Sequence, residues 1–176
     1  MLPELLDGDL DLQLAYRYDL FPRTWPDQIV ETPVMDENLV LCVPRDHPLA
    51  AGRTVRLRDL RSETWIASRP ESAGAQALLR LCGTAGFVPD IAFRSNDYAV
   101  VCGLVGCGLG IALVPALGCV PAPGLRTLRL SRRSPRRHVT VLRRATNTNP
   151  LVKDAMRGLI EVARGVQSEV SGATGP

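Results

Sequence analysis

The chain has 176 residues, of which 45% are hydrophobic and 22% are charged, and its formal net charge is +3. This composition is that of a globular protein with one domain or two small lobes. The charge is too small for the whole chain to act as a nucleic-acid-binding surface. No apolar run reaches the length of a bilayer span. The N-terminus lacks the basic and then apolar pattern of a signal peptide, so we expect a cytoplasmic protein.

Hydrophobic alternation and short apolar runs predict a series of strands along the chain. The first predicted strand contains Leu10, Leu12 and Leu14 in alternation, and a later one is an apolar run closed by Pro44, typical of a strand buried on both faces. Residues 16–27 contain two prolines and are predicted to form a loop. The predicted strands are residues 9–15, 28–33, 38–43, 64–67, 90–94, 111–114, 125–130 and 138–143.

Helices are predicted between these strands. Residues 3–8 are predicted to be the end of a helix that stops at Gly8, and residues 57–60 a short helical turn. A helix over 72–85 stops at Gly86, and another starts near Asn96 or Asp97, either of which can cap it. The last helix is capped by Asn149, begins at Pro150 and ends near residue 165. The polar tail, 169–176, is predicted to be disordered. Strands alternating with helices indicate an α/β fold, in which ligands bind beyond the carboxyl ends of the strands.

Five segments in consecutive order carry a resemblance to a known family. They are LLDGDLDL at residues 5–12, LVLCVPRDHPLA at 39–50, DL followed by WI at 59–66, CGTAGFVP at 82–89 and LVGCGLGIALVP at 104–115. Their order and spacing resemble those of the effector-binding domain of LysR-type transcriptional regulators, over roughly residues 2–165. The resemblance implies a fold like that of type 2 periplasmic-binding proteins. Such a fold has two Rossmann-like lobes joined by two crossing strands, with a small effector in the cleft.

The resemblance also implies how the chain is divided. Residues 1–43 and 131–168 would form the first lobe, and residues 44–130 the second. The sequence starts at a point where family members have already formed a winged helix-turn-helix, a linker helix and the opening strand–helix–strand of the first lobe. We therefore expect an incomplete first lobe, DNA binding only through the missing N-terminal part, and a homodimer or higher oligomer. An open sheet edge would favour pairing with another molecule.

Candidate effector-binding residues follow from the segments that line the cleft in the family. Ser68, Arg69 and Ser72 precede a helix whose free N–H groups suit a carboxylate or another anion, and Arg69 could clamp it. Helix capping equally explains Ser72, and capping also explains Asn96. Tyr16 and Arg17 follow the first predicted strand, and they are equally well explained as exposed loop residues. The full set is Tyr16, Arg17, Ser68, Arg69, Ser72, Asn96, Asp97 and Pro115.

The glycines and cysteines of residues 102–119 allow further hypotheses. The glycines at 103–110 close a helix and precede a strand, which is opposite to a phosphate-binding loop, so they indicate tight backbone packing. The five cysteines lack metal-ligand spacing, and we expect them to be small buried hydrophobic residues. A redox role for the pair Cys102 and Cys107 is the alternative. No metal and no cofactor are predicted.

Other classes of function receive less support. The arginines between residues 126 and 144 are typical of a solvated strand face, because no aromatic residues are interleaved for base stacking. No nucleophile–base motif indicates an enzyme. A solute-binding protein of a transporter shares the fold but would need a secretion signal or a lipid anchor. The sequence therefore favours a non-enzymatic, effector-sensing domain that binds a small anionic metabolite and contacts no membrane.

Overall fold

The computed structural model describes residues 2–131 and 134–173, apart from the side chains of 168–173. Its chain divides into two units. The first consists of Met1–Arg17, Pro22–Glu37 and Arg137–Pro176, and the second of Tyr18–Phe21 and Asn38–Arg136. The expected second lobe, residues 44–130, lies within the second unit.

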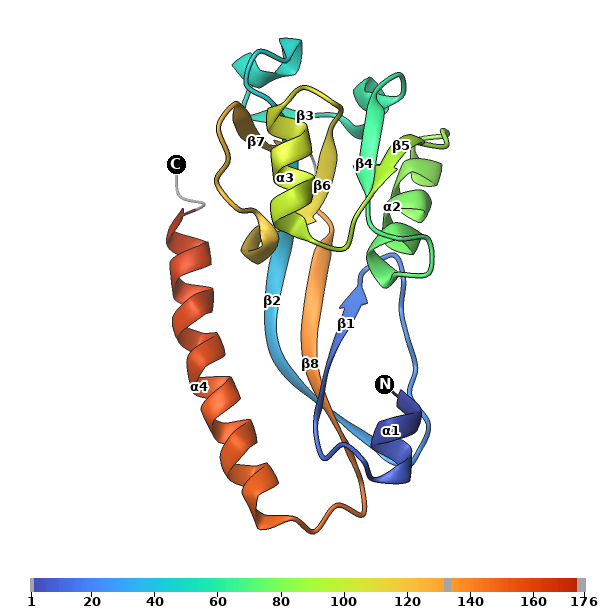
Figure 1. The fold of residues 1–176 in the computed structure, drawn as a ribbon, viewed down its shortest axis with the longest axis vertical. Helices are drawn as coiled ribbons and strands as arrows, with labels where there is room; N and C mark the ends of the chain where they lie inside the picture. Colours follow the sequence, from blue (N-terminus) through green and yellow to red (C-terminus); the bar gives the residue numbers. More distant parts are fainter. Residues whose placement is uncertain (1, 132–133, 174–176) are drawn as a thin grey trace. The chain divides into compact units, whose positions relative to one another are not determined.

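The first unit contains α1 (Leu2–Asp7), β1 (Gln13–Tyr18), the start of β2 (Ile29–Pro44), β8 (Arg136–Arg144) and α4 (Pro150–Ala173), with the strands in the order β1-β8-β2 (Figure 1). As predicted, α1 ends at Gly8, whose φ of 98° is a left-handed value that glycine adopts readily. Leu5 of α1 packs with one buried residue from each strand, namely Ala15, Ile29 and Leu142. These contacts form the core between α1 and the sheet.

Two strand predictions for this unit were wrong. The first strand covers Gln13–Tyr18 rather than residues 9–15, so the first three residues of the predicted loop, 16–18, are in fact extended. Residues 28–33 and 38–43 are not separate strands, because β2 runs without interruption through Pro33. In the strand order β2 lies between β8 and β7. Its register with β6 covers residues 39–42 and that with β7 residues 41–44, so neither of these strands pairs with β2 at Pro33. Proline is tolerated on the side of a strand where its missing N–H is not needed for pairing.

The last helix confirms its predicted start and corrects its predicted end. The Asn149 side chain accepts a hydrogen bond from the backbone N–H of Leu151 (3.1 Å), and Pro150 is the first helical residue. The helix does not end near residue 165 but continues to Ala173. The remainder of the predicted disordered tail, residues 174–176, lies outside the described residues. No helix in the described ranges combines the length and apolar character needed to cross a membrane.

A buried ion pair joins β2 to β8 within the first unit. Arg137 Nε donates to Glu37 Oε1 over 2.7 Å, and Arg137 Nη2 contacts the same oxygen. Glu37 is only 2% exposed and Arg137 only 8%. The Arg137 guanidinium also lies 4.5 Å from the ring centroid of Tyr16 on β1, a cation–π geometry. One side chain thus contacts both neighbouring strands.

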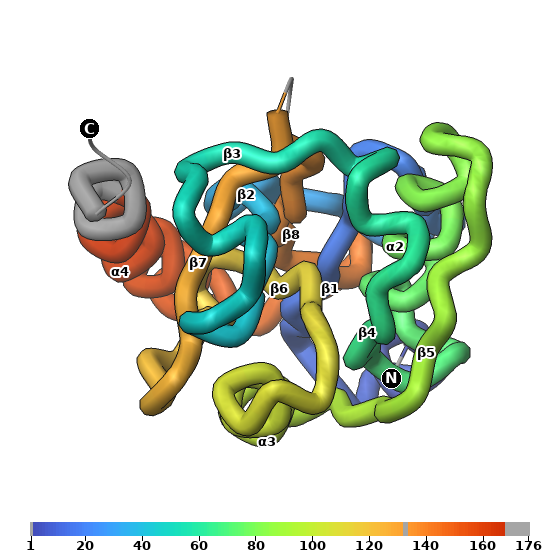
Figure 2. Tube along the Cα trace, turned by 90° about the horizontal axis from the view of Figure 1, so that it is seen from above, coloured from blue at the N-terminus to red at the C-terminus, as the bar shows by residue number. Residues whose placement is uncertain are grey.

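The second unit is built from the remaining strands and two helices. The rest of β2 pairs antiparallel with β6 (Ala112–Pro115) and β7 (Leu125–Leu130), and β7 pairs with the short β3 (Thr54–Val55). A separate parallel pair consists of β4 (Thr64–Ala67) and β5 (Asp90–Arg94). The helices are α2 (Ala73–Thr84) and α3 (Tyr98–Gly106), which the views of Figures 1 and 2 show on either side of β4 and β6. The predictions of residues 64–67, 90–94 and 125–130 as strands are confirmed.

The glycine-rich segment before β6 joins the two groups of strands in this unit. Ile111 N–H donates to Thr64 O (2.9 Å), and Ile66 N–H donates to Ile111 O (2.8 Å). Gly110 has φ +149°, and a Cβ atom there would lie 2.7 Å from Thr64 O. A Cβ on Gly106 would likewise collide with Pro123 O. The expectation of tight backbone packing is confirmed for Gly106 and Gly110 but not for Gly103 and Gly108, where an added Cβ would meet nothing within 4 Å.

The close approach at Gly110 generates a first prediction. Gly110→Ala places a methyl group against the Thr64 carbonyl on a backbone conformation that side chains rarely adopt. We expect the free energy of unfolding to fall by roughly 2–4 kcal/mol. Gly103→Ala is the matched control, since a Cβ there meets nothing within 4 Å and alanine favours a helix. Urea denaturation of both variants measures the difference, and equal stability of the two would contradict the packing role.

The buried ion pair generates a second prediction. Glu37→Ala leaves the Arg137 guanidinium buried without its carboxylate, which should cost about 3–5 kcal/mol of unfolding free energy. The exposed pair Arg157–Asp154, with side chains 69% and 67% exposed and 3.2 Å between charged atoms, is the control. Asp154→Ala should change stability by less than about 0.5 kcal/mol. A Glu37→Ala variant as stable as the Asp154→Ala variant would refute the assignment.

Candidate functional site

The candidate site in the second unit lies where β4 and β5 end and the next helices begin. Ser72 caps α2, because its Oγ accepts a hydrogen bond from the N–H of Ala75 over 3.1 Å. Asp97, and not Asn96, caps α3, because its carboxylate accepts from the N–H groups of Ala99 (2.8 Å) and Val100 (3.4 Å). Both helices therefore begin with a side-chain cap, as the sequence predicted.

Asn96 has a different role from the capping one that the sequence also allowed. Its Oδ1 accepts a hydrogen bond from the backbone N–H of Arg69 over 3.0 Å. This bond ties the turn after β4 to the turn after β5. The guanidinium of Arg94 donates to the carbonyl of Ser68 over 2.9 Å and supports the same turn. The two turns are held together by side chains although 27 residues separate Arg69 from Asn96.

A small cavity of about 20 Å³ adjoins these turns. Its walls come from the ends of β4 and β6, from β2, and from the first turns of α2 and α3. Two of the sequence-predicted residues, Ser68 and Pro115, are in its lining. This volume holds about one water molecule. The complete lining is Tyr18, Leu39, Ala67, Ser68, Gly74, Leu78, Tyr98, Leu113 and Pro115.

Sequence reasoning missed the two tyrosines and the glycine of this lining. A Cβ on Gly74 would lie 3.2 Å from the Tyr18 hydroxyl and 3.6 Å from Ser68 Oγ, so the absence of a side chain there leaves room beside both hydroxyls. Tyr98 is the first residue of α3 and lines the same cavity. The sequence contained one signal for Tyr98, which is its position directly after the helix cap Asp97.

Tyr16 and Arg17 belong to the first unit and have partners there. Tyr16 lies under the Arg137 guanidinium, and Arg17 Nε forms an ion pair with Glu31 Oε1 over 2.9 Å. Their proposed part in effector binding stays a prediction. The cavity of the second unit is lined instead by Tyr18, the last residue of β1.

The charges at the two helix N-termini differ, and this difference decides where an anion would bind. The partial positive charge of α3 already faces the carboxylate of Asp97. The cap of α2 is the neutral hydroxyl of Ser72; in the turn before it the Arg69 side chain is exposed, and so is the carboxylate of Glu71. Among the described residues, Arg69 forms no side-chain ion pair. The turn before α2 is therefore the more favourable of the two positions for a carboxylate or phosphate.

The cysteines and arginines differ in part from their predicted environments. Cys107 is exposed and Cys119 is half-buried, so the expectation that all five cysteines are buried was wrong. Burial raises the pKa of Cys82 to about 12.

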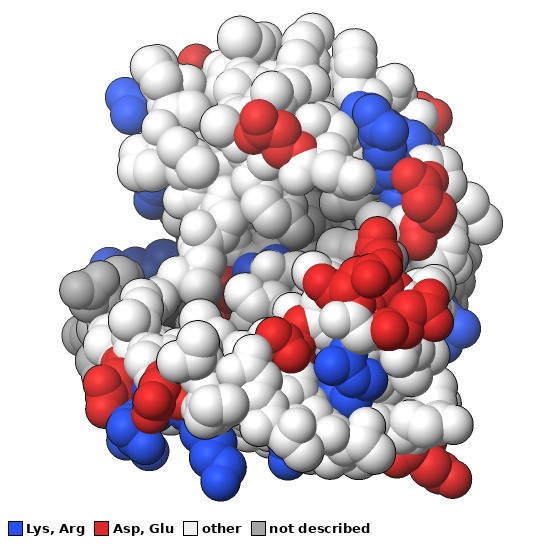
Figure 3. All heavy atoms as spheres, turned by 60° about the horizontal axis from the view of Figure 1, so that its bottom comes forward, with Lys and Arg blue, Asp and Glu red and all other residues white. Residues whose placement is uncertain are grey.

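On the face that Figure 3 shows, basic side chains are scattered among acidic and uncharged ones and form no continuous basic surface. Of the arginines in the predicted basic stretch, Arg132 and Arg133 lie outside the described residues.

Comparison with known sequences identifies a family for this chain. The profile described as LysR substrate binding domain matches residues 1–164. The transcriptional regulator AlsR of Bacillus subtilis is 30% identical over 115 residues, which are 64% of this chain and 36% of that protein. The dual regulator GltC of the same species is 33% identical over 115 residues, 65% of this chain and 37% of its own length. The chain thus spans less than half the length of these relatives.

Solved structures show the same fold. A cysteine mutant of OxyR from Corynebacterium glutamicum superposes with a TM-score of 0.80 at 21% identity, covering 98% of this chain and 54% of that one. The regulatory domain of MetR from Neisseria meningitidis gives a TM-score of 0.74 at 18% identity, covering 94% of this chain and 76% of that domain. The predicted α/β fold, similar to type 2 periplasmic-binding proteins, is confirmed.

Proposed function

Because the chain belongs to the LysR substrate binding domain family, we propose that it is the effector-sensing part of a transcriptional regulator that binds a small anionic metabolite. The anion would bind at the turn before α2, with Ser68 and Arg69 as its main contacts. Tyr18 and Tyr98 line the adjoining cavity, which holds about one water molecule, and would border the bound effector rather than enclose it. No catalytic step is required of this site.

The observation that carries this proposal is the contrast between the two helix caps. At α3 the Asp97 carboxylate already accepts from the first N–H groups and would repel an anion, whereas the α2 cap is a neutral hydroxyl with the exposed Arg69 guanidinium and the exposed Glu71 carboxylate in the turn before it. The Asn96 bond to the Arg69 backbone holds that turn in place before a ligand arrives, which lowers the ordering cost of binding. The effector would therefore be small, with a carboxylate or phosphate group at one end.

The wider role of the protein follows from the same family. We expect a cytoplasmic homodimer or higher oligomer that contacts DNA only through a winged helix-turn-helix outside this sequence. The chain alone should then show no specific operator binding in a gel-shift experiment. The competing functions are a solute-binding protein of a transporter and an α/β enzyme. Product formation from any bound metabolite would favour the enzyme.

The third prediction concerns Arg69. A panel of small carboxylates and phosphates is screened for an increase in the melting temperature of the chain, and calorimetry then gives the dissociation constant of each binder. A concentration of 100 times the dissociation constant stabilises the folded state by about 2.7 kcal/mol. Arg69→Ala should weaken binding at least about tenfold, because it removes a charged hydrogen-bond donor.

Arg56→Ala is the matched control for this experiment. Arg56 is also an exposed arginine before a helical turn, but it is engaged with Asp59 over 2.9 Å and lies outside the cavity lining. Its loss should leave the dissociation constant unchanged. Equal weakening by both variants would indicate a nonspecific charge effect. A panel in which only uncharged compounds stabilise the chain would overturn the anionic effector.

A further inference from the structure

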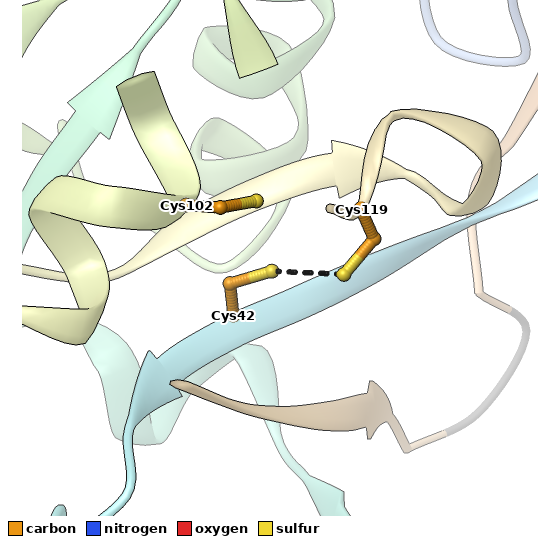
Figure 4. Close-up of side chains that lie close together, drawn as sticks. All are labelled: Cys42, Cys102 and Cys119. Carbon is orange, nitrogen blue, oxygen red and sulfur yellow. Dashed lines mark hydrogen bonds between the residues drawn. The ribbon is translucent and has the colours of Figure 1, made fainter. Parts of the chain in front are cut away.

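Three cysteines from separate parts of the second unit bring their sulfur atoms together. Cys42 lies on β2, Cys102 on α3, and Cys119 directly after the short 3-10 helix Ala116–Gly118. The three Sγ atoms all lie within 4.8 Å of one another, and those of Cys42 and Cys119 are 3.7 Å apart. Figure 4 shows the three side chains directed toward a common point.

The surroundings of this three-sulfur cluster are apolar. Cys42 and Cys102 are fully buried, and Cys119 is half-buried. The side chains packed around them include Ile66, Val101, Val105, Ala112 and Val114. Ordinary core packing can bury a cysteine as a small hydrophobic residue, but it does not require three sulfurs from distant segments to meet. The Cys102 thiol also donates to the carbonyl oxygen of Gly118 over 4.0 Å. A set of three sulfur ligands selects soft metal ions.

The protonation of the cluster is compatible with metal binding. A hydrogen bond from the Cys42 thiol lowers the pKa of Cys119 to about 7, against the opposing effect of burial. The pKa of Cys42 is raised, because its thiol is the donor to Cys119 and is buried. Burial also raises the pKa of Cys102. Metal binds to the thiolate form of each sulfur, and the geometry of the three sulfur atoms, not their titration, is the basis of the site.

We propose that Cys42, Cys102 and Cys119 form a three-sulfur binding site for a soft, thiophilic ion of the copper(I) class. With metal–sulfur bonds of about 2.3 Å, three sulfurs around one ion lie roughly 3.8–4 Å apart, compared with 3.7 Å between Cys42 and Cys119 and at most 4.8 Å between any two of the three sulfurs. A structural zinc site needs four ligands, and the described His, Cys, Asp and Glu residues supply only these three to the group.

The binding step changes no oxidation state. Each bound thiol exchanges its S–H bond for a bond from sulfur to the ion, and its proton passes to solvent. Cys119, as the half-buried member, offers the route for the ion and the protons. Because protons are released, the apparent affinity should increase as the pH rises. The site shares no residue with the proposed effector contacts, so either proposal can fail without the other.

The test is an anaerobic titration of the fully reduced 176-residue chain with copper(I), in competition with a chromophoric copper(I) chelator. We expect one tightly bound ion per chain, and X-ray absorption should show a shell of three sulfurs at about 2.3 Å. Bound copper(I) should also protect Cys119 from alkylation. Loss of a supporting group around a metal costs 10–100-fold in affinity, so Cys119→Ala, which removes a ligand, should cost at least about 100-fold.

Two cysteines outside the cluster provide matched controls. Cys82→Ala removes a buried thiol and Cys107→Ala an exposed one, and both variants should retain the copper(I) affinity of the unmodified chain. Circular dichroism confirms that each variant is folded, and half-buried Cys119 is the substitution that disturbs the core least. Failure of the chain to compete with the chelator would overturn the site. So would equal losses in the control variants, or tighter binding of zinc than of copper(I).

Discussion

The second unit depends on how closely the backbone at Gly110 can approach the carbonyl of Thr64. Only because no Cβ is present can Ile111 exchange two hydrogen bonds with β4, one with Thr64 and one with Ile66. These bonds connect the parallel pair β4–β5 to β6, which in turn pairs antiparallel with β2. A side chain at residue 110 would separate the two groups of strands.

This junction also determines where the candidate site forms. β4 leads to Ser68 and Arg69, whereas β6 ends at Pro115, and its register places Pro115 opposite Leu39 of β2. The cavity lies where these strand ends meet. The caps of α2 and α3 then differ in charge, so the same fold presents one helix N-terminus open to an anion and one already neutralised by Asp97.

The sequence predicted those parts of the fold that depend on local patterns. Residues 125–130 alternate clearly, and Ser72, Asn149 and Pro150 are strong helix-start signals, so these elements were correctly placed. The start of β1 was predicted too early, because the alternation of Leu10, Leu12 and Leu14 begins before the first residue of the strand, Gln13. Continuity of β2 through Pro33 depends on β6 and β7 pairing with β2 only beyond this residue, which is a property of the strand pairing and not of the local sequence.

Of the candidate site, only the helix-capping residues could be predicted from the sequence. Ser72 and Asp97 have residue types that cap helices, whereas the contribution of Tyr18 and Gly74 to one cavity depends on tertiary packing. The three-sulfur cluster depends on tertiary packing even more strongly. Cys42 and Cys119 are 77 residues apart and meet only because β2 and the segment after β6 lie together. The sequence instead suggested Cys102 and Cys107, which are close in the chain but differ in exposure.

Helix α3 connects the two proposed sites. Tyr98, which lines the cavity, and Cys102, in the sulfur cluster, are four residues apart and therefore lie on the same face of the helix. The Tyr98 ring occupies the space where Gly118 lacks a side chain, and Cys119 follows Gly118 directly. An ion held by the three sulfurs would fix the helix that carries Tyr98 and Asp97. Any effect of that ion on effector affinity must then be matched by an equal effect of the effector on ion affinity.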